Sequence, residues 1–364
     1  MRILALDLGT ASTKTYVHIL DTETGEIQRE SFPTSLTEFL AILRRIKPDQ
    51  VVVEPTPITG LLVDLCQAEN IQVKVANVRD PAWQNRTNKT DRNDAELLAR
   101  LAASGQLRTV CVPPRDVREW RSLIFYRHQM IRERIRCKNR IKSVLRNELI
   151  STKGLWSKLG MTSARCIAKP LSLCDQSEFW RGILWEEIAR LAEIQKRLES
   201  ISGKLDQLAE SKIETRALSA LPGVGNRLAE TIVATLVTAQ RFHNRREVAA
   251  YIGLCPRVEQ SGKHVVYGRI TKAGNRLLRS LLVEVAWLGI RHDPWMKAIY
   301  DQVLRGDPSR SNRAVTAVAR RLLIRCWAIL RDLERTPPPT KSVKKTVRVK
   351  SSRKAATRVR RKAA

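Results

Sequence analysis

The sequence predicts a mixed α/β domain at the N-terminus, a long helical middle and a mostly helical C-terminal domain. Three observations support this division: strand-like runs alternate with amphipathic helices first, apolar residues then recur at helical spacing, and glycine turns divide the last helices. The chain of 364 residues is long enough for two domains. We place the α/β domain at 1–112, the helical region at 113–213, the C-terminal domain at 214–336 and a basic tail at 337–364.

The first predicted strand, 2–8, alternates with a period of two, which places Ile3, Ala5 and Asp7 on one face. Two more strands follow around a hairpin loop, and helices then alternate with short strands. Three antiparallel strands followed by alternating helices and strands is the order of an RNase H-like domain. The other expected elements are strands at 15–20, 26–32, 51–53 and 71–76 and helices at 36–46 and 58–68.

Four acids of this domain are expected to converge. Asp7 lies near the end of the first strand, and Glu54 follows a continuous apolar run that is typical of a buried parallel strand. Asp91 and Asp94 lie three residues apart in the first turn of a predicted helix with Thr90 as its N-cap, so they share a face. Clustered carboxylates are costly without cations. Two Mg²⁺ ions about 3.5–4 Å apart would offset that cost and would serve phosphodiester chemistry.

Other interpretations of these acids remain open. An aspartate before glycine often belongs to a turn, and Asp91 and Asp94 could simply stabilise a helix N-terminus through the helix dipole. Residues 7–14, Asp-Leu-Gly-Thr-Ala-Ser-Thr-Lys, also resemble the first phosphate loop of actin-like ATPases and sugar kinases. That function needs a second phosphate loop and an adenosine loop, and the sequence contains neither.

The charge balance points to a polyanionic partner. Lys and Arg number 66 and Asp and Glu 36, which gives a net charge of +30. Such an excess repels itself in a compact chain unless a polyanion shares the surface, so nucleic acid is the first candidate and an acidic membrane the second. We expect a cytoplasmic chain, because no run of about 20 apolar residues and no signal peptide is present. The seven scattered cysteines, without a CxxC pair, predict reduced buried thiols.

The middle of the chain, from about 115 to 215, has helical periodicity throughout. Within it, apolar residues alternate spacings of three and four over three heptads, which suits an intramolecular or dimeric coiled coil. These heptad residues are Leu191, Ile194, Leu198, Ile201, Leu205 and Leu208.

Two motifs of the C-terminal domain could contact phosphate. Gly223 and Gly225 permit a tight turn whose backbone N–H groups point to a phosphate, as in a helix-hairpin-helix, although an ordinary αα turn has the same pattern. Ser261 lies among cations, as a serine nucleophile that attacks a phosphodiester requires. Spacing alone favours a simpler interpretation, a polar hairpin that only binds phosphate. The flanking cations are Arg257, Lys263, Arg269, Lys272 and Arg276.

Together these residues resemble the transposases of the insertion sequence 110 family, over about residues 1–330. The N-terminal Leu-Asp-Leu-Gly strand, Glu54 and the Lys-Thr-Asp-Arg-Asn-Asp-Ala segment at 89–95 match the DEDD pattern of that family. The glycines at 222–225 and the Gln-Ser-Gly segment at 260–262, with Gly-Arg-Ile-Thr-Lys after it, match its C-terminal domain.

The resemblance implies a RuvC-type RNase H-like domain, a coiled coil and a transposase domain that cleaves and exchanges DNA strands through a covalent serine–DNA intermediate. It further implies a structured guide RNA, the bridge RNA, that pairs with donor and target DNA, and a homo-oligomer, a dimer or a tetramer in synapsis, at the bacterial nucleoid. Pro55 and Pro57 depart from the family pattern, and the basic tail lies outside the shared core. The metal ligands it implies are Asp7, Glu54, Asp91 and Asp94, and the nucleophile is Ser261.

Two alternatives compete with this function. A metal-dependent junction nuclease of the RuvC type would cut by water attack and would need the four acids but not Ser261. A non-enzymatic nucleic-acid-binding protein would need neither. All three should bind nucleic acid less tightly as salt rises, because phosphate contacts release counterions.

Overall fold

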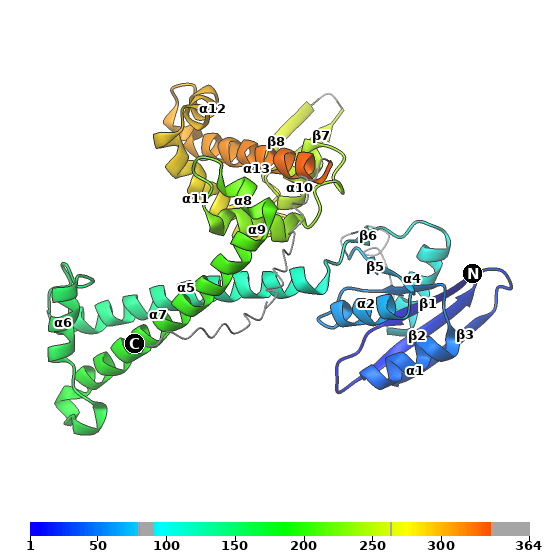
Figure 1. The fold of residues 1–364 in the computed structure, drawn as a ribbon, viewed down its shortest axis with the longest axis horizontal. Coiled ribbons are helices and arrows are strands. Elements are labelled where there is room, and N and C mark those ends of the chain that lie inside the picture. Colours follow the sequence, from blue (N-terminus) through cyan, green and yellow to red (C-terminus); the bar gives the residue numbers. More distant parts are fainter. Residues whose placement is uncertain (79, 81–90, 263, 336–364) are drawn as a thin grey trace, which may run out of the picture.

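The computed structural model describes residues 1–78, 80, 91–262 and 264–335, with the backbone alone at 91 and 92. A sheet domain, a long two-helix arm and a helical C-terminal domain follow one another along the chain, and the helix α5 connects all three (Figure 1). The predicted N-cap Thr90 and the basic tail lie outside the described residues.

The N-terminal domain contains a six-stranded sheet of order β3-β2-β1-β4-β5-β6. The first three strands are antiparallel neighbours, β4 and β5 run parallel to β1, and β6 is antiparallel to β5. The short apolar strand β4 is fully buried because helices cover both faces of the sheet. The strands are β1 (Arg2–Asp7), β2 (Lys14–Asp21), β3 (Ile27–Pro33), β4 (Gln50–Val53), β5 (Gln72–Ala76) and β6 (Thr109–Val110).

The two faces of this sheet have different cores. Leu4, Leu6 and Val53 face α1 (Leu36–Ile46) and α2 (Thr59–Ala68) in a core of large aliphatic side chains. The opposite face packs against α4 (Asp91–Ala103) through smaller residues, which let the helix approach the sheet closely. That second core consists of Ile3, Ala5, Val52, Ala76, Leu98, Ala99 and Ala102.

The arm is an antiparallel pair of helices, α5 (Arg115–Asn147) and α7 (Phe179–Ser211), that pack along each other. The heptad side chains of α7 form the contact and are buried, apart from the partly buried Leu208. The predicted helical stretch is therefore not continuous, because the chain folds back to bury its own apolar stripe. The turn contains α6 (Lys158–Ile167), η1 (Leu171–Leu173) and η2 (Gln176–Glu178).

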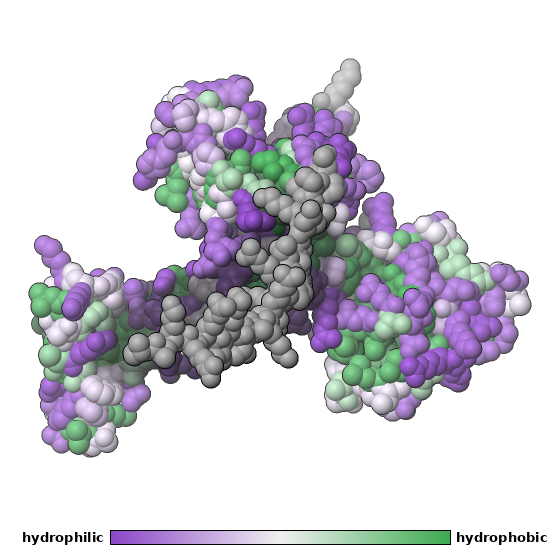
Figure 2. Space-filling model, viewed as in Figure 1, coloured by the Kyte–Doolittle hydropathy of each residue, from purple (hydrophilic) through white to green (hydrophobic). Residues whose placement is uncertain are grey.

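Figure 2 shows hydrophilic residues over most of the visible surface, with hydrophobic residues exposed near the tip of the arm. Leu149, Leu159 and Leu173 are among these exposed side chains. None of the described helices combines the length and the apolar character needed to cross a membrane.

The C-terminal domain is mostly helical, with one two-stranded ribbon projecting from it (Figure 1). Its core continues that of the arm, with α9, α11 and α13 at the centre. The structure thus confirms a mixed α/β N-terminal domain and a mostly helical remainder. The elements are α8 (Ile213–Ser219), α9 (Asn226–Leu236), α10 (Arg245–Ile252), β7 (Pro256–Ser261), β8 (His264–Ile270), α11 (Arg276–His292), α12 (Pro294–Leu304), η3 (Pro308–Arg310) and α13 (Ser311–Arg335).

All seven cysteines are free thiols. Cys66, Cys137 and Cys326 are buried, as predicted. The prediction of burial is wrong for Cys111 and Cys166, which are exposed on the surface.

Candidate active site and nucleic-acid interface

Two of the predicted acids lie at the ends of neighbouring parallel strands. Asp7 is the last residue of β1, and Glu54 follows the last residue of β4 directly. Leu6 and Val53 are register partners, so the two acids occupy adjacent positions one residue further on. Because side chains alternate along a strand, Asp7 shares the face of Ala5, and Glu54 that of Val52. Both acids are therefore on the α4 side of the sheet, and both are partly buried.

The other two predicted acids lie in the first turn of α4, which packs against β1, β2 and β4. Asp94 is only 4% exposed and precedes the fully buried Leu98 by one helical turn, so it lies on the face that covers the sheet. Asp91 begins the helix three residues earlier, and its side chain lies outside the described atoms.

The chemistry of these side chains suits a hard divalent cation, because carboxylate oxygens are the ligands that Mg²⁺ prefers. Within the described residues, however, no group of three or more His, Cys, Asp or Glu side chains is close enough to hold a metal. Asp7, Glu54 and Asp94 share one side of the sheet without closing around an ion by themselves. The side chain of Asp91 lies outside the described atoms, so the four-acid site stays a prediction.

The prolines beside Glu54 lie in an ordered turn. Pro55 and Pro57 are both exposed between β4 and α2. The buried Thr59 fixes this turn, because its Oγ1 donates to the Glu54 carbonyl at 3.1 Å and accepts from the Thr56 N–H at 2.7 Å. The prolines therefore stiffen the turn after Glu54.

The candidate nucleophile lies at the end of an exposed ribbon. Ser261 is the last residue of β7 and pairs in register with His264, the first residue of β8. Gly262 has a φ of +58°, a conformation that glycine adopts without strain, and its carbonyl accepts a hydrogen bond from Gln260 Nε2 at 3.2 Å. Lys263, the next predicted phosphate contact, lies outside the described residues.

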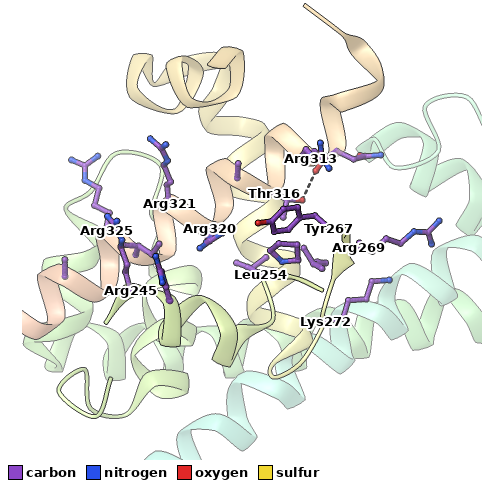
Figure 3. Close-up of a pocket in the computed structure, with 18 of the residues that line it drawn as sticks. Arg245, Leu254, Tyr267, Arg269, Lys272, Arg313, Thr316, Arg320, Arg321 and Arg325 are labelled. Atoms are coloured by element: carbon purple, nitrogen blue, oxygen red, sulfur yellow. Dashed lines mark hydrogen bonds between the residues drawn. The ribbon is translucent and has the colours of Figure 1, made fainter. Parts of the chain in front are cut away.

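An open groove of about 1770 Å³ lies between the base of this ribbon, α10 and α13. Figure 3 shows arginines from three separate segments around it, together with Tyr267 and Lys272. Eight cations line the groove and no carboxylate does. They are Arg245, Arg246, Arg269, Lys272, Arg313, Arg320, Arg321 and Arg325.

The described carboxylates do not pair with the cations of the groove. Across the described part of the chain, none of these eight cations forms an ion pair with a carboxylate. Arg325 instead stacks over Trp295, at 5.0 Å from the ring centroid. Clustered cations without partners raise the local potential and favour a polyanion. The groove, defined by these eight cations, is therefore a candidate nucleic-acid interface.

The sequence reasoning found only part of this interface. It proposed Arg269 and Lys272, which line the groove, and Arg257 and Arg276, which do not. The six arginines of α10 and α13 were missed. A signal was present, since Arg313, Arg320, Arg321 and Arg325 follow spacings of seven, eight and twelve that put them on one face of a helix.

The glycine turn at 221–225 joins α8 to α9 and lies outside the groove lining. Gly223 has a φ of +79°, and Gly225 is the N-cap of α9. Both glycines are exposed, while Val224 between them is buried and anchors the turn. The turn can thus present the N-terminus of α9 to a ligand.

The carboxylates and the serine lie on different domains of one chain. Asp7 and Glu54 belong to the sheet domain, which precedes α5. Ser261 belongs to the ribbon of the C-terminal domain, which follows the arm (Figure 1). A mixed α/β domain with strand-end carboxylates, joined to a helical domain with an arginine-lined groove, is typical of proteins that bind nucleic acid.

Comparison with known proteins narrows this class. A model described as transposase of the DEDD IS110 type matches residues 7–149, and one described as transposase IS116/IS110/IS902 family matches residues 215–301. The chain belongs to the IS110/IS116/IS902 family of transposases.

Named relatives are similar over most of their length. The transposase for insertion sequence element IS1111A of Coxiella burnetii is 29% identical over 262 residues, 67% of either chain. The putative transposase y4rJ of Sinorhizobium fredii is 28% identical over 306 residues, 76% of either chain. The transposase for insertion sequence element IS1328 of Yersinia enterocolitica is 23% identical over 335 residues, 90% of this chain and 96% of the relative.

Proposed function

We propose that this transposase cleaves and rejoins DNA through a covalent serine–DNA intermediate, with Ser261 as the nucleophile. The observation that carries the proposal is the position of Ser261, exposed at the tip of a ribbon whose base lines a groove of eight cations that pair with no described carboxylate. A nucleophile for a phosphodiester must reach the phosphorus atom while cations hold the flanking phosphates. The exposed position of Ser261 supports the first requirement, and the cations at the base of the ribbon support the second.

The sheet domain is, in this proposal, an RNase H-like domain of the RuvC type. The strand order, with three antiparallel strands followed by two strands parallel to the first, supports it. Asp7, Glu54, Asp91 and Asp94 would hold Mg²⁺ at the carboxyl ends of the parallel strands. When bound, Mg²⁺ supplies electrostatic stabilisation of the charge that develops on the transferring phosphate and on the leaving oxygen.

The groove and the glycine turn have separate tasks. The arginines of α10 and α13 bind phosphates and hold the duplex in register, and the N-terminus of α9 after Gly225 contacts a further phosphate as a helix-hairpin-helix does. Contacts from the groove and the glycine turn to phosphates do not distinguish one base sequence from another. A structured guide RNA that pairs with donor and target DNA would provide that choice, with the protein reading backbone and shape.

The separation of the candidate site residues also supports an oligomer. Ser261 and the carboxylates lie on separate domains of one chain, so the nucleophile of one copy can meet the carboxylates of another. We infer a homodimer, with a tetramer in synapsis around two duplexes, in the cytoplasm at the bacterial nucleoid.

A covalent-adduct assay tests this function. Purified full-length protein with its co-purified RNA is incubated with Mg²⁺ and a labelled duplex that carries the joined ends of its own insertion element, and is then denatured and run on a gel. We expect a protein–DNA adduct that Ser261→Ala abolishes while duplex binding persists. An adduct formed at full yield by Ser261→Ala would exclude the serine mechanism.

The same gel distinguishes the alternatives. Cleaved ends without an adduct, lost in Asp7→Asn but not in Ser261→Ala, would indicate a nuclease that acts by water attack. Binding without cleavage by any variant, at every Mg²⁺ concentration, would indicate a nucleic-acid-binding protein. Thr10→Ala, on the exposed loop after Asp7, serves as the control substitution for the sheet domain.

A further inference from the structure

The ribbon brings a second ionisable side chain beside Ser261. Ser261 and His264 are directly opposite partners in the antiparallel register, on either side of the turn at Gly262. Opposite residues in such a pair point to the same face, with Cβ atoms about 4.5–5.5 Å apart. At that spacing a serine hydroxyl and an imidazole nitrogen have the reach to form a hydrogen bond. Both residues are exposed, so a phosphate can approach them together.

We propose that His264 is a catalytic residue that removes the proton from the Ser261 hydroxyl during strand cleavage. This inference rests on the proposed serine mechanism and deepens it, because a serine hydroxyl is a weak nucleophile until a base takes its proton.

The proton and the bonds balance in a single cycle. As the bond between Ser261 Oγ and phosphorus forms, the Oγ proton passes to a ring nitrogen of His264. The bond between phosphorus and the leaving deoxyribose oxygen breaks, and the imidazolium returns the proton to that oxygen. The reverse sequence, with a new deoxyribose hydroxyl as attacking group, rejoins the strands and restores the serine.

The register of the ribbon also places the neighbouring side chains on its two faces. Alternation from the register puts Glu259 on the same face as Ser261, two residues further from the tip. The other face carries Val258, Val265 and Tyr267, of which Tyr267 lines the groove.

Among the described charged residues of the ribbon, Glu259 shares the face of Ser261 and His264. Glu259 can stabilise the imidazolium, and Arg257 lies further from the tip. In the described part of the ribbon no hydrogen bond joins Ser261 to His264. Catalytic hydrogen bonds are often long in free enzymes and tighten when the substrate binds.

The test measures the rate of adduct formation with the same labelled duplex, Mg²⁺ and co-purified RNA. We expect His264→Ala to form the serine adduct about 10²–10⁴-fold more slowly than the unaltered protein, with duplex binding unchanged. Free imidazole should restore part of the rate. His292→Ala, which removes another exposed histidine of the same domain, is the matched control and should react at the normal rate.

Two further readouts separate proton transfer from a merely structural role. Only neutral imidazole accepts a proton, so acid conditions that protonate a catalytic imidazole should slow the unaltered protein, and His264→Ala should lack this acid sensitivity. In a Ser261→Cys background, His264→Ala should slow adduct formation much less. A cysteine thiol has an ordinary pKa of about 8.5, so it loses its proton without a base far more readily than a serine hydroxyl does.

The possible failures are distinguishable. An adduct that survives Ser261→Ala would remove the serine mechanism itself. An adduct that requires Ser261 but forms in His264→Ala at the normal rate and with the normal pH profile would overturn only the role of His264. A slow His264→Ala that imidazole does not rescue and whose pH profile is unchanged would also overturn it, since the ring would then act only on structure.

Discussion

The arginine-lined groove leads to a quantitative prediction about salt. Each phosphate neutralised by a cation contributes about −0.9 to the slope of log K against log salt concentration. Eight cations line the groove, so full engagement would give a slope of about −7 from this surface. Replacing Arg313, Arg320 and Arg321 together by alanine should reduce the magnitude of the slope by about 3. Arg325 is left in place because its stacking on Trp295 contributes to packing.

The assay is fluorescence anisotropy of a labelled duplex of arbitrary sequence, titrated at several salt concentrations. The control variant replaces Arg44, Arg45 and Arg197, which lie outside the groove and already pair with surface carboxylates. It changes the net charge by the same amount. An unchanged slope in the groove variant, or an equal loss in the control variant, would refute the assignment of duplex binding to this groove.

Three further predictions concern stability. Burial raises the pKa of Glu230 to about 7 despite a neighbouring guanidinium. Between pH 4.5 and 7 the folded chain therefore keeps a proton that the unfolded chain has lost, so the free energy of unfolding falls as pH rises through this range. Glu230→Gln should flatten this fall in the unfolding midpoint. If both proteins show the same pH dependence of unfolding, the assignment is wrong. Leu205→Ala should destabilise the arm by about 2–5 kcal/mol in denaturant titrations, because Leu205 is fully buried, whereas Leu208→Ala, at a partly buried position, should cost clearly less. Equal losses would contradict the packing of α5 on α7. Gly223→Ala should lower stability by about 1 kcal/mol because φ is +79°, and Gly225→Ala, at φ −80° with open space around it, should be tolerated in the same thermal melts; the reverse order would contradict the turn geometry.

Much of the N-terminal domain could be predicted from local patterns in the sequence. Alternating side chains at 2–7 and the unbroken valines at 51–53 determine which segments are strands and which are buried on both faces. The position of Glu54 at a strand end follows from the same run. Likewise, the heptad of α7 indicates a helix with one apolar stripe, whatever covers it.

Only the tertiary structure shows which helix packs against the apolar stripe of α7. A heptad alone is compatible with a partner from the same chain or from another chain. In the folded protein α5 covers the heptad of α7, because the chain reverses between 148 and 178 and buries both apolar faces at once.

The convergence of separate segments was likewise beyond the sequence. The sequence determined the basic charge, the strand-end acids, the glycine turn and the serine hairpin, because each depends on neighbours along the chain. The groove depends on α10, the ribbon and α13 meeting, although up to about 80 residues separate Arg245 from Arg325 along the chain. Such contacts arise from the packing of buried faces in the helical core, and local spacing does not encode where those faces meet.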